Sequence, residues 1–219
     1  TYDNVYFDTQ ANPNSLSMVV KSKAMSPGGS WSFSYTPGAP NVFDTTTVTS
    51  PDGTTTYRHL GPNYSSSGSV WMVGLLMSKQ IGSAQSESYT WGKQRISPQN
   101  NMRPGAFVLK VDTGEVNAPV LTQRSIARNG ASHTTTFGSF DVYGNPGTIT
   151  ESGPNGGSRS TTVSYNLNTA KWIIRQVKDE SASGGVSITR TIDSSGNVLS
   201  VNRDGVQTDR SYDTEGNVS

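Results

Sequence analysis

Two histidines are the first side chains in this 219-residue sequence to consider for chemistry. His59 and His133 lie far apart in threonine-rich stretches, and neither has a second histidine at the short spacing of a metal site. The chain has no cysteine. Since a zinc site needs three or four ligands that converge on one point, the sequence favours two solvated strand histidines over a metal centre.

Glycine–serine pairs occur, but not in the patterns that nucleophilic or phosphate chemistry requires. A Gly-x-Ser-x-Gly elbow carries the serine of many hydrolases, whereas Gly138-Ser139 and Gly157-Ser158 lack those flanking residues. Gly28-Gly29 is not followed by the Gly-Lys-Ser/Thr of a phosphate-binding loop. We therefore predict no nucleophilic serine, and we interpret Gly28-Gly29 as a turn.

Carboxylates need the same check because glycosidases use a facing pair of them. Four glutamates lie in polar strand or turn sequences: Glu87, Glu115, Glu151 and Glu180. The sequence supports an enzyme less than the two other functions considered below. Two carboxylates that faced each other across a cleft would favour an enzyme. The sequence predicts no catalytic residue and no cofactor.

Aspartates recur with one motif, Asp-x-x-Gly-Asn. The three copies are Asp141, Gly144 and Asn145; Asp193, Gly196 and Asn197; and Asp213, Gly216 and Asn217. Recurrence at a structural period favours a turn role over catalysis. Calcium binding is conceivable for turns rich in aspartate and asparagine, but the spacings of the EF-hand and of the glycine-rich calcium repeats are missing. We therefore predict no bound metal.

An aromatic row is the remaining chemical signal. Trp31, Phe33 and Tyr35 alternate with serine, so a strand would place all three rings on one face. Such a row could stack against a sugar. We favour packing against a neighbouring sheet, because contiguous exposed apolar patches are uncommon.

The Asp-x-x-Gly-Asn copies have the composition of tight reversals between strands. Glycine adopts a positive φ without steric strain, and asparagine tolerates it better than most residues. An aspartate ahead of the turn can accept hydrogen bonds from turn amides. Bulky residues such as Ile192 and Val198 flank the copies, and the sequence therefore predicts hairpins that reverse there.

The copies also recur at the period of a repeat array. Asp141, Asn166, Asp193 and Asp213 begin copies about 20 to 27 residues apart, a spacing typical of repeat proteins. The copy that begins at Asn166 is decayed, since it lacks the glycine. One hairpin cannot bury a face alone, so neighbouring copies must stack.

The pattern Tyr/Phe-Asp-x-x-Gly-Asn, then a short strand, a glycine turn and Thr-Arg-x-Tyr-Asp, resembles the YD repeat of the RHS proteins. The match is good over residues 186–219, fair over 130–185 and scattered over 1–129. The run from Trp71 to Ile81 is similar to a segment that often precedes these repeats. We predict an irregular β region over 1–129 and a YD-repeat region over 130–219.

This resemblance implies part of a large hollow β-shell that encloses or displays a toxin or effector, similar to the shells of Tc toxins and teneurins. The aspartate-rich autocleavage core of many such shells has no match here, so no self-processing activity is carried over. The expected partners are the remainder of a larger repeat chain and an enclosed toxin. The alternative is a cell-surface carbohydrate-binding or adhesion module that uses the aromatic strand.

Composition agrees with an all-β chain. Apolar residues make up 32%, the mean hydropathy is −0.52, and the formal net charge is +1. A near-neutral chain lacks the basic footprint of a nucleic-acid-binding protein. The longest apolar run, Val70 to Met77, is shorter than the roughly 20 residues of a membrane-spanning helix. The absence of cysteine excludes disulfides and fits a secreted or cell-surface protein of bacterial type.

We therefore expect antiparallel hairpins that form a curved or spiralling sheet. Period alone leaves residues 70–77 open between a short helix and a buried strand. Residues 81–91 should form a strand, and the loop after it should run from Gly92 to Gly105, which includes two prolines.

Overall fold

A computed structural model describes residues 1–5, 17–64, 70–97 and 116–218. The chain divides into two compact units, Thr1–Ser132 and His133–Ser219. The predicted start of the YD repeats at residue 130 rests on the sequence pattern alone and stays a prediction.

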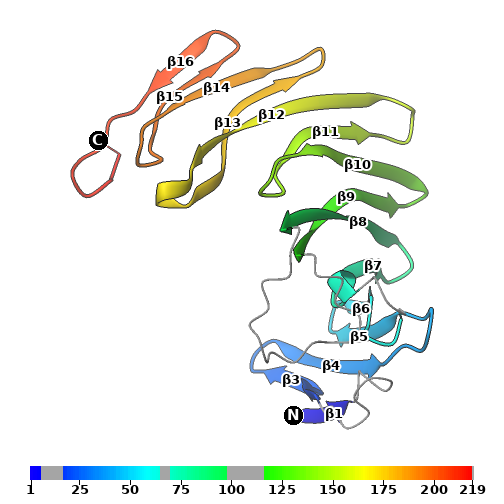
Figure 1. Cartoon of the computed structure of the whole chain (residues 1–219). Helices are drawn as coiled ribbons and strands as arrows, with labels where there is room; N and C mark the ends of the chain where they lie inside the picture. The colour runs from blue at the N-terminus through cyan, green and yellow to red at the C-terminus, as the bar shows by residue number, and fades with distance from the viewer. Residues whose placement is uncertain (6–16, 65–69, 98–115, 219) are drawn as a thin grey trace. The chain divides into compact units, whose positions relative to one another are not determined.

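The first unit contains a small two-stranded sheet and a larger sheet (Figure 1). The small sheet pairs β1 (Tyr2–Val5) with β2 (Ser17–Val20) in antiparallel fashion. The larger sheet consists of β3 (Ser22–Met25), β4 (Gly29–Thr36), β5 (Asp44–Ser50), β6 (Gly53–His59), β7 (Leu76–Ile81), β8 (Gln85–Ser97) and β9 (Val116–Arg128). Each of its strands pairs antiparallel with the next one along the chain.

The second unit also consists of antiparallel strands, each paired with the next one along the chain. Its strands are β10 (Ala131–Phe140), which begins just before the unit, β11 (Pro146–Ser152), β12 (Ser158–Asn168), β13 (Ile173–Ala182), β14 (Ser187–Ile192), β15 (Val198–Arg203) and β16 (Val206–Asp209). The predicted all-β fold of antiparallel hairpins is confirmed. The only helical turns in the described part of the chain are two short 3-10 segments, η1 (Val70–Met72) and η2 (Thr169–Lys171).

Three sequence expectations need adjustment. The strand expected over 81–91 begins only at Gln85, because Ile81 ends β7 and residues 82–84 form a turn. Residues 70–77 are neither one helix nor one strand: η1 ends at Met72, Gly74 reverses the chain with a φ of 88°, and β7 begins at Leu76. The predicted loop from Gly92 is wrong at its start, because β8 continues to Ser97. Gly92 lies within this strand and does not end it. A Cβ at this position would lie only 2.9 Å from Thr122 Cγ2, so the glycine allows the neighbouring strand to approach closely.

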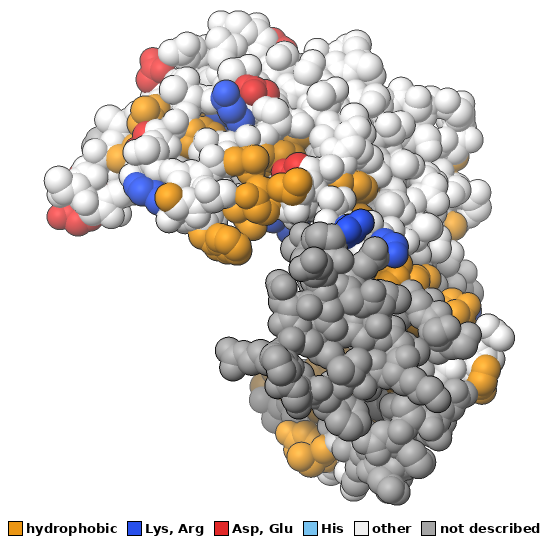
Figure 2. Space-filling model, viewed as in Figure 1, with side chains coloured by type: hydrophobic (Ala, Val, Ile, Leu, Met, Phe, Trp, Pro, Cys, Tyr) orange, Lys and Arg blue, Asp and Glu red, His pale blue; other side chains and the backbone are white. Residues whose placement is uncertain are grey.

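The larger sheet of the first unit and the strands of the second unit are polar, and few apolar side chains cover them. Among the described residues, only three hydrophobic side chains are less than a tenth exposed: Leu60, Val120 and Val163. Figure 2 shows mostly backbone and uncharged polar side chains on the face in view, with few charged groups, while many of the hydrophobic side chains gather in one region over the second unit. With so little apolar burial, strand ladders, cross-strand pairs and turn geometry must hold each unit together.

Candidate functional site

The Asp193 copy forms a closed corner of five hydrogen bonds. Two are between backbone groups: the Asp193 N–H donates to the Asn197 carbonyl (3.0 Å), and the Gly196 N–H to the Asp193 carbonyl (3.1 Å). Oδ1 of Asp193 accepts the N–H groups of Ser195 (2.7 Å) and Asn197 (2.8 Å). Oδ2 accepts the amide of the Asn197 side chain (2.9 Å). The aspartate, the glycine and the asparagine of the motif therefore each have a defined structural role in the corner.

The Asp141 and Asp213 copies form the same corner. The backbone bonds measure 3.0 and 3.1 Å in both, and each carboxylate again accepts two backbone N–H groups and one asparagine amide. The glycine takes the left-handed conformation in each, with φ of 79° at Gly144, 91° at Gly196 and 84° at Gly216. The structure thus places all three predicted copies at strand reversals.

A fourth reversal shows what the aspartate adds. In Gly153–Gly157 the Gly153 N–H donates to the Gly157 carbonyl (3.0 Å), and the Gly156 N–H to the Gly153 carbonyl (3.2 Å). Gly156 has a φ of 78°. The backbone path therefore closes without a carboxylate, and the aspartates of the other corners contribute three further hydrogen bonds each.

Tyrosines couple the corners to the next repeat. The Tyr165 hydroxyl donates to the carbonyl of Pro146 (3.0 Å), the residue directly after the Asp141 corner. The Tyr212 hydroxyl donates to the carbonyl of Val198 (2.9 Å), the residue directly after the Asp193 corner. A tyrosine one repeat later thus satisfies the same backbone acceptor in both cases, which gives a physical reason for a tyrosine ahead of the motif.

Side-chain amides make further links between corners and strands. Nδ2 of Asn145, a side chain that is 1% exposed, donates to the carbonyl of Ile174 as well as to its own corner. Gln176 Nε2 donates to the Gly196 carbonyl. The corners are therefore bound to β13 as well as closed upon themselves.

The decayed copy reverses two residues later than the sequence suggested. Asn166 is a strand residue of β12 that pairs with Gln176 of β13. The reversal begins at Asn168, whose Oδ1 accepts the Lys171 N–H (3.2 Å) at the start of η2. Without a glycine at the expected position, a capped 3-10 turn replaces the corner.

These contacts predict a loss of stability in acid. Hydrogen bonds from amide groups hold the pKa of Asp193 and of Asp213 below the ordinary value of 3.8. The largest cause is the backbone N–H of Asn197 for Asp193 and the side-chain amide of Asn217 for Asp213. The Tyr89 hydroxyl likewise lowers the pKa of Glu87 below 4.5. A carboxyl whose pKa is depressed by folding stabilises the fold fully above its unfolded pKa and loses this effect as the pH falls through the folded value. We expect the free energy of unfolding to decrease as the pH is lowered from about 4.5. Urea unfolding at a series of pH values measures this decrease. A value that stayed constant down to about pH 3 would contradict these hydrogen bonds.

Glu87, Glu151 and Glu180 each lie in an ion pair with a basic side chain. Glu87 is 6% exposed and accepts Tyr89 Oη (2.6 Å), Arg124 Nη2 (2.8 Å) and Gln85 Nε2 (3.1 Å). Glu151 pairs with Arg159 on the neighbouring strand, and Glu180 pairs with Arg190 (2.7 Å). Glu115 lies outside the described residues. This geometry holds strands together and supplies no acid–base pair at a cleft.

The two histidines lie in different units. His59 is half-buried in β6 opposite Asp44, and burial lowers the pKa of its imidazole below 6.5 although the Asp44 charge opposes this. His133 is exposed at the start of the second unit. Within the part of the chain that the structure describes, no three histidine or acidic side chains cluster where a metal ion could bind.

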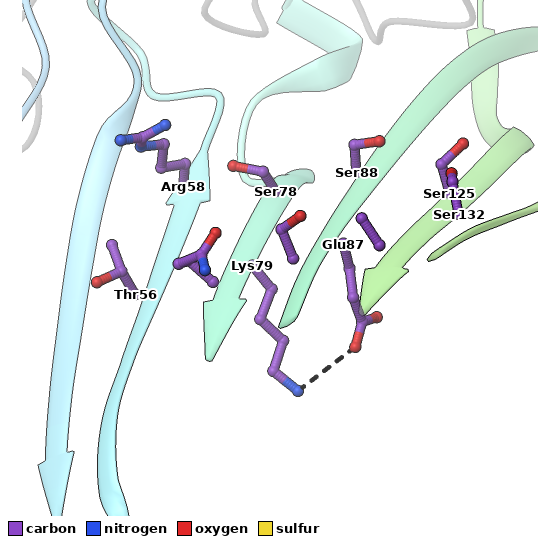
Figure 3. Close-up of a pocket in the computed structure, with 11 residues that line it drawn as sticks. Thr56, Arg58, Ser78, Lys79, Glu87, Ser88, Ser125 and Ser132 are labelled. Carbon is purple, nitrogen blue, oxygen red and sulfur yellow. Dashed lines mark ion pairs between the residues drawn. The ribbon is translucent and has the colours of Figure 1, made fainter. Parts of the chain in front are cut away.

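An open hollow of about 470 Å³ lies over the first unit's larger sheet. Directly opposite residues of antiparallel strands share a face, and this aligns Arg58, Ser78, Ser88 and Ser125 in one row across four strands. Figure 3 shows this row on one side, while the Lys79–Glu87 ion pair extends away from it. The hollow is lined by hydroxyls and one guanidinium, groups that suit a polar ligand.

The predicted aromatic row lies on β4 as three half-buried side chains. Lys23 Nζ lies 5.6 Å from the ring centroid of Trp31, Phe33 is opposite Val48, and the Tyr35 hydroxyl donates to the Val20 carbonyl (2.9 Å). The rings share one face, and part of each is covered by neighbouring strands. A sugar-stacking role for this row stays a prediction.

Sequence reasoning missed a buried polar cluster in the first unit. Asp44 is 8% exposed and Asn63 is 2% exposed. Oδ1 of Asp44 accepts the Gly38 N–H (2.6 Å), and Asn63 Nδ2 donates to the Gly38 carbonyl (3.0 Å). The cluster binds two loops to the first residue of β5.

No helix among the described residues has the length and apolar character needed to cross a membrane. Comparison with known proteins adds no assignment: no protein-family model matches the chain, and no curated protein matches it.

Proposed function

We propose that this chain is a non-catalytic structural segment of an RHS/YD-repeat protein, and that it forms part of a β-shell that encloses or displays a toxin or effector. The observation that carries the proposal is the threefold recurrence of one corner, closed by the same five hydrogen bonds at Asp141, Asp193 and Asp213. Identical bends at a repeat period are what a propagating scaffold requires.

The tyrosine contacts support the same proposal. Tyr165 and Tyr212 each bind the carbonyl that follows the preceding corner, so each repeat positions the next. A sheet built in this way can extend by adding copies without a large hydrophobic core. Further repeats and an enclosed toxin are the partners we propose, at a secreted or cell-surface location.

The carboxylates support a scaffold over an enzyme. A general acid or base needs a free lone pair or proton directed at a substrate. Asp141, Asp193 and Asp213 each accept three hydrogen bonds within their own corner, which occupy three of the roughly four acceptor positions of a carboxylate. We therefore expect no catalytic activity from these residues.

The alternative, a cell-surface carbohydrate-binding or adhesion module, is favoured by one observation: the indole of Trp172 is 75% exposed. A shell could also carry such a site, so the two proposals are compatible.

Electron microscopy of the complete protein that the natural gene encodes would test the shell. We expect further Asp-x-x-Gly-Asn repeats in the reading frame and a hollow shell, with density for a separate domain inside it or beside it. A reading frame without further repeats, or a solid particle, would contradict the proposal.

A further inference from the structure

The reversal between β12 and β13 presents an exposed indole from a constrained backbone. η2 is capped by Asn168, and the N–H of Trp172 donates to the Thr169 carbonyl (3.2 Å). Trp172 then takes the left-handed conformation, with φ 58° and ψ 31°. Its side chain is 75% exposed.

A tryptophan is a poor choice for this backbone conformation. The left-handed region places Cβ close to the following carbonyl, so glycine is the usual occupant and a bulky residue is an outlier. At six other reversals of the second unit, glycine has a positive φ: Gly144, Gly156, Gly184, Gly196, Gly205 and Gly216. The other residues of the unit with a positive φ are the small Ser139 and Asp204, so Trp172 is the one bulky side chain among those described there. Folding alone would be served better by glycine at 172, and a strained residue of this kind points to a role outside the fold.

The surroundings hold this reversal in place on both sides. Asn168 Nδ2 donates to the Ser194 carbonyl (2.9 Å), and Lys171 Nζ donates to Ser195 Oγ (3.0 Å). On the other side, the Asn145 amide is bound to Ile174, two residues beyond Trp172. The indole therefore projects from a backbone that neighbouring turns fix, and amide, ammonium and hydroxyl groups lie beside that backbone.

We propose, building on the carbohydrate-binding alternative above, that Trp172 is the stacking platform of a glycan-binding site, whose ligand is a pyranose ring of an oligosaccharide. The face of an indole carries negative charge density, which attracts the partly positive C–H hydrogens on the face of a sugar ring. Lys171, Asn168 and Ser195 supply the hydrogen-bonding groups that a sugar's hydroxyls need nearby.

The size of the patch favours a sugar over a protein partner. A stable protein interface buries about 800 Å² per partner around an apolar core, whereas a single aromatic side chain contributes only about 150–250 Å². The other exposed apolar side chains near the reversals that flank Trp172 are Val142, Tyr143, Leu167 and Leu199. One ring on a polar turn matches a sugar ring better than a second protein.

The test uses Trp172→Gly, which removes the ring and also relieves the backbone strain. The wild-type chain is applied to a printed array of oligosaccharides built from neutral, N-acetylated and acidic pyranoses. The best binder is then titrated in solution by isothermal titration calorimetry, a readout that does not depend on the indole that the variants remove. Trp172→Phe serves as the conservative variant. Met18→Ala, at a side chain that is also 75% exposed but lies in the first unit, serves as the matched control.

We expect wild type and Met18→Ala to bind alike, Trp172→Phe to bind more weakly, and Trp172→Gly to bind roughly tenfold more weakly or not at all. Thermal unfolding of Trp172→Gly should occur at the wild-type temperature or above it, which separates loss of the site from loss of the fold. The proposal is overturned if no oligosaccharide binds, if Trp172→Gly binds like wild type, or if ultracentrifugation shows that Trp172 mediates self-association instead. The shell proposal does not depend on any of these results.

Discussion

Replacing Gly38 with alanine should strongly destabilise the first unit, although it adds only one methyl group. The Gly38 N–H and carbonyl are both bound, to the buried side chains of Asp44 and Asn63 respectively. A Cβ at Gly38 would overlap the carbonyl oxygen of Val42 and would lie 2.9 Å from the carbonyl carbon of Phe43. These are backbone atoms, so the loop must shift and both hydrogen bonds must weaken.

We expect Gly38→Ala to lower the free energy of unfolding by about 3 kcal/mol, at the upper end of the range for overpacked and unsatisfied sites. Urea unfolding followed by circular dichroism measures this loss. Gly157→Ala is the matched control, because nothing lies within 4 Å of its added methyl group and its φ is unstrained. It should change stability by no more than about 0.5 kcal/mol. Equal stabilities of the two variants would mean that the Asp44 cluster does not close the loop as described.

Replacing Gly196 with alanine should cost more stability than the same change at Gly156, which holds the equivalent corner position. The φ of 91° at Gly196 is strained for any residue with a Cβ, and the added atom would lie 2.8 Å from Ile173 Cδ1. The strain costs about 1–2 kcal/mol, and the contact with β13 adds roughly 1 kcal/mol because a side-chain end can move aside. The expected total loss is about 2–3 kcal/mol.

Gly156→Ala separates the two contributions. Gly156 has a φ of 78°, but nothing lies within 4 Å of the methyl group that alanine would add there. It should lose only the strain contribution of about 1–2 kcal/mol, measured by the same urea unfolding. If both variants lost the same amount, the Asp193 corner would not pack on β13. If neither lost stability, the left-handed conformation itself would be in question.

The corners could be predicted from sequence because their information is local. Asp193 accepts hydrogen bonds from the N–H groups of the residues two and four positions later in the chain. Gly196 takes the left-handed conformation, which residues with a Cβ seldom adopt. All of this lies within five consecutive residues, so composition and spacing sufficed for the turns and, through their recurrence, for the hairpins. The decayed copy failed for the same reason: without glycine, the sequence no longer marks the reversal, which moved to Asn168.

Features that join distant residues could not be predicted. The Asp44 cluster depends on a contact between Asn63 and Gly38, 25 residues apart, and on backbone carbonyls that no motif identifies. The serine row beside Arg58 depends on the register of four strands, and a slip of one residue would place it on the opposite face. Trp172 reads as an ordinary apolar residue until its φ is known.

The Asp-x-x-Gly-Asn corners are structural bends, and thermal unfolding of wild type and Asp193→Ala, each with calcium and with a chelator, tests this claim most directly. Asp193→Ala removes three hydrogen bonds, yet it leaves the backbone closure that Gly153–Gly157 achieves without a carboxylate. We predict that Asp193→Ala unfolds at a lower temperature than wild type, and that calcium shifts neither protein. A calcium-dependent rise in the wild-type unfolding temperature that Asp193→Ala abolishes would show that the corner is an ion site instead.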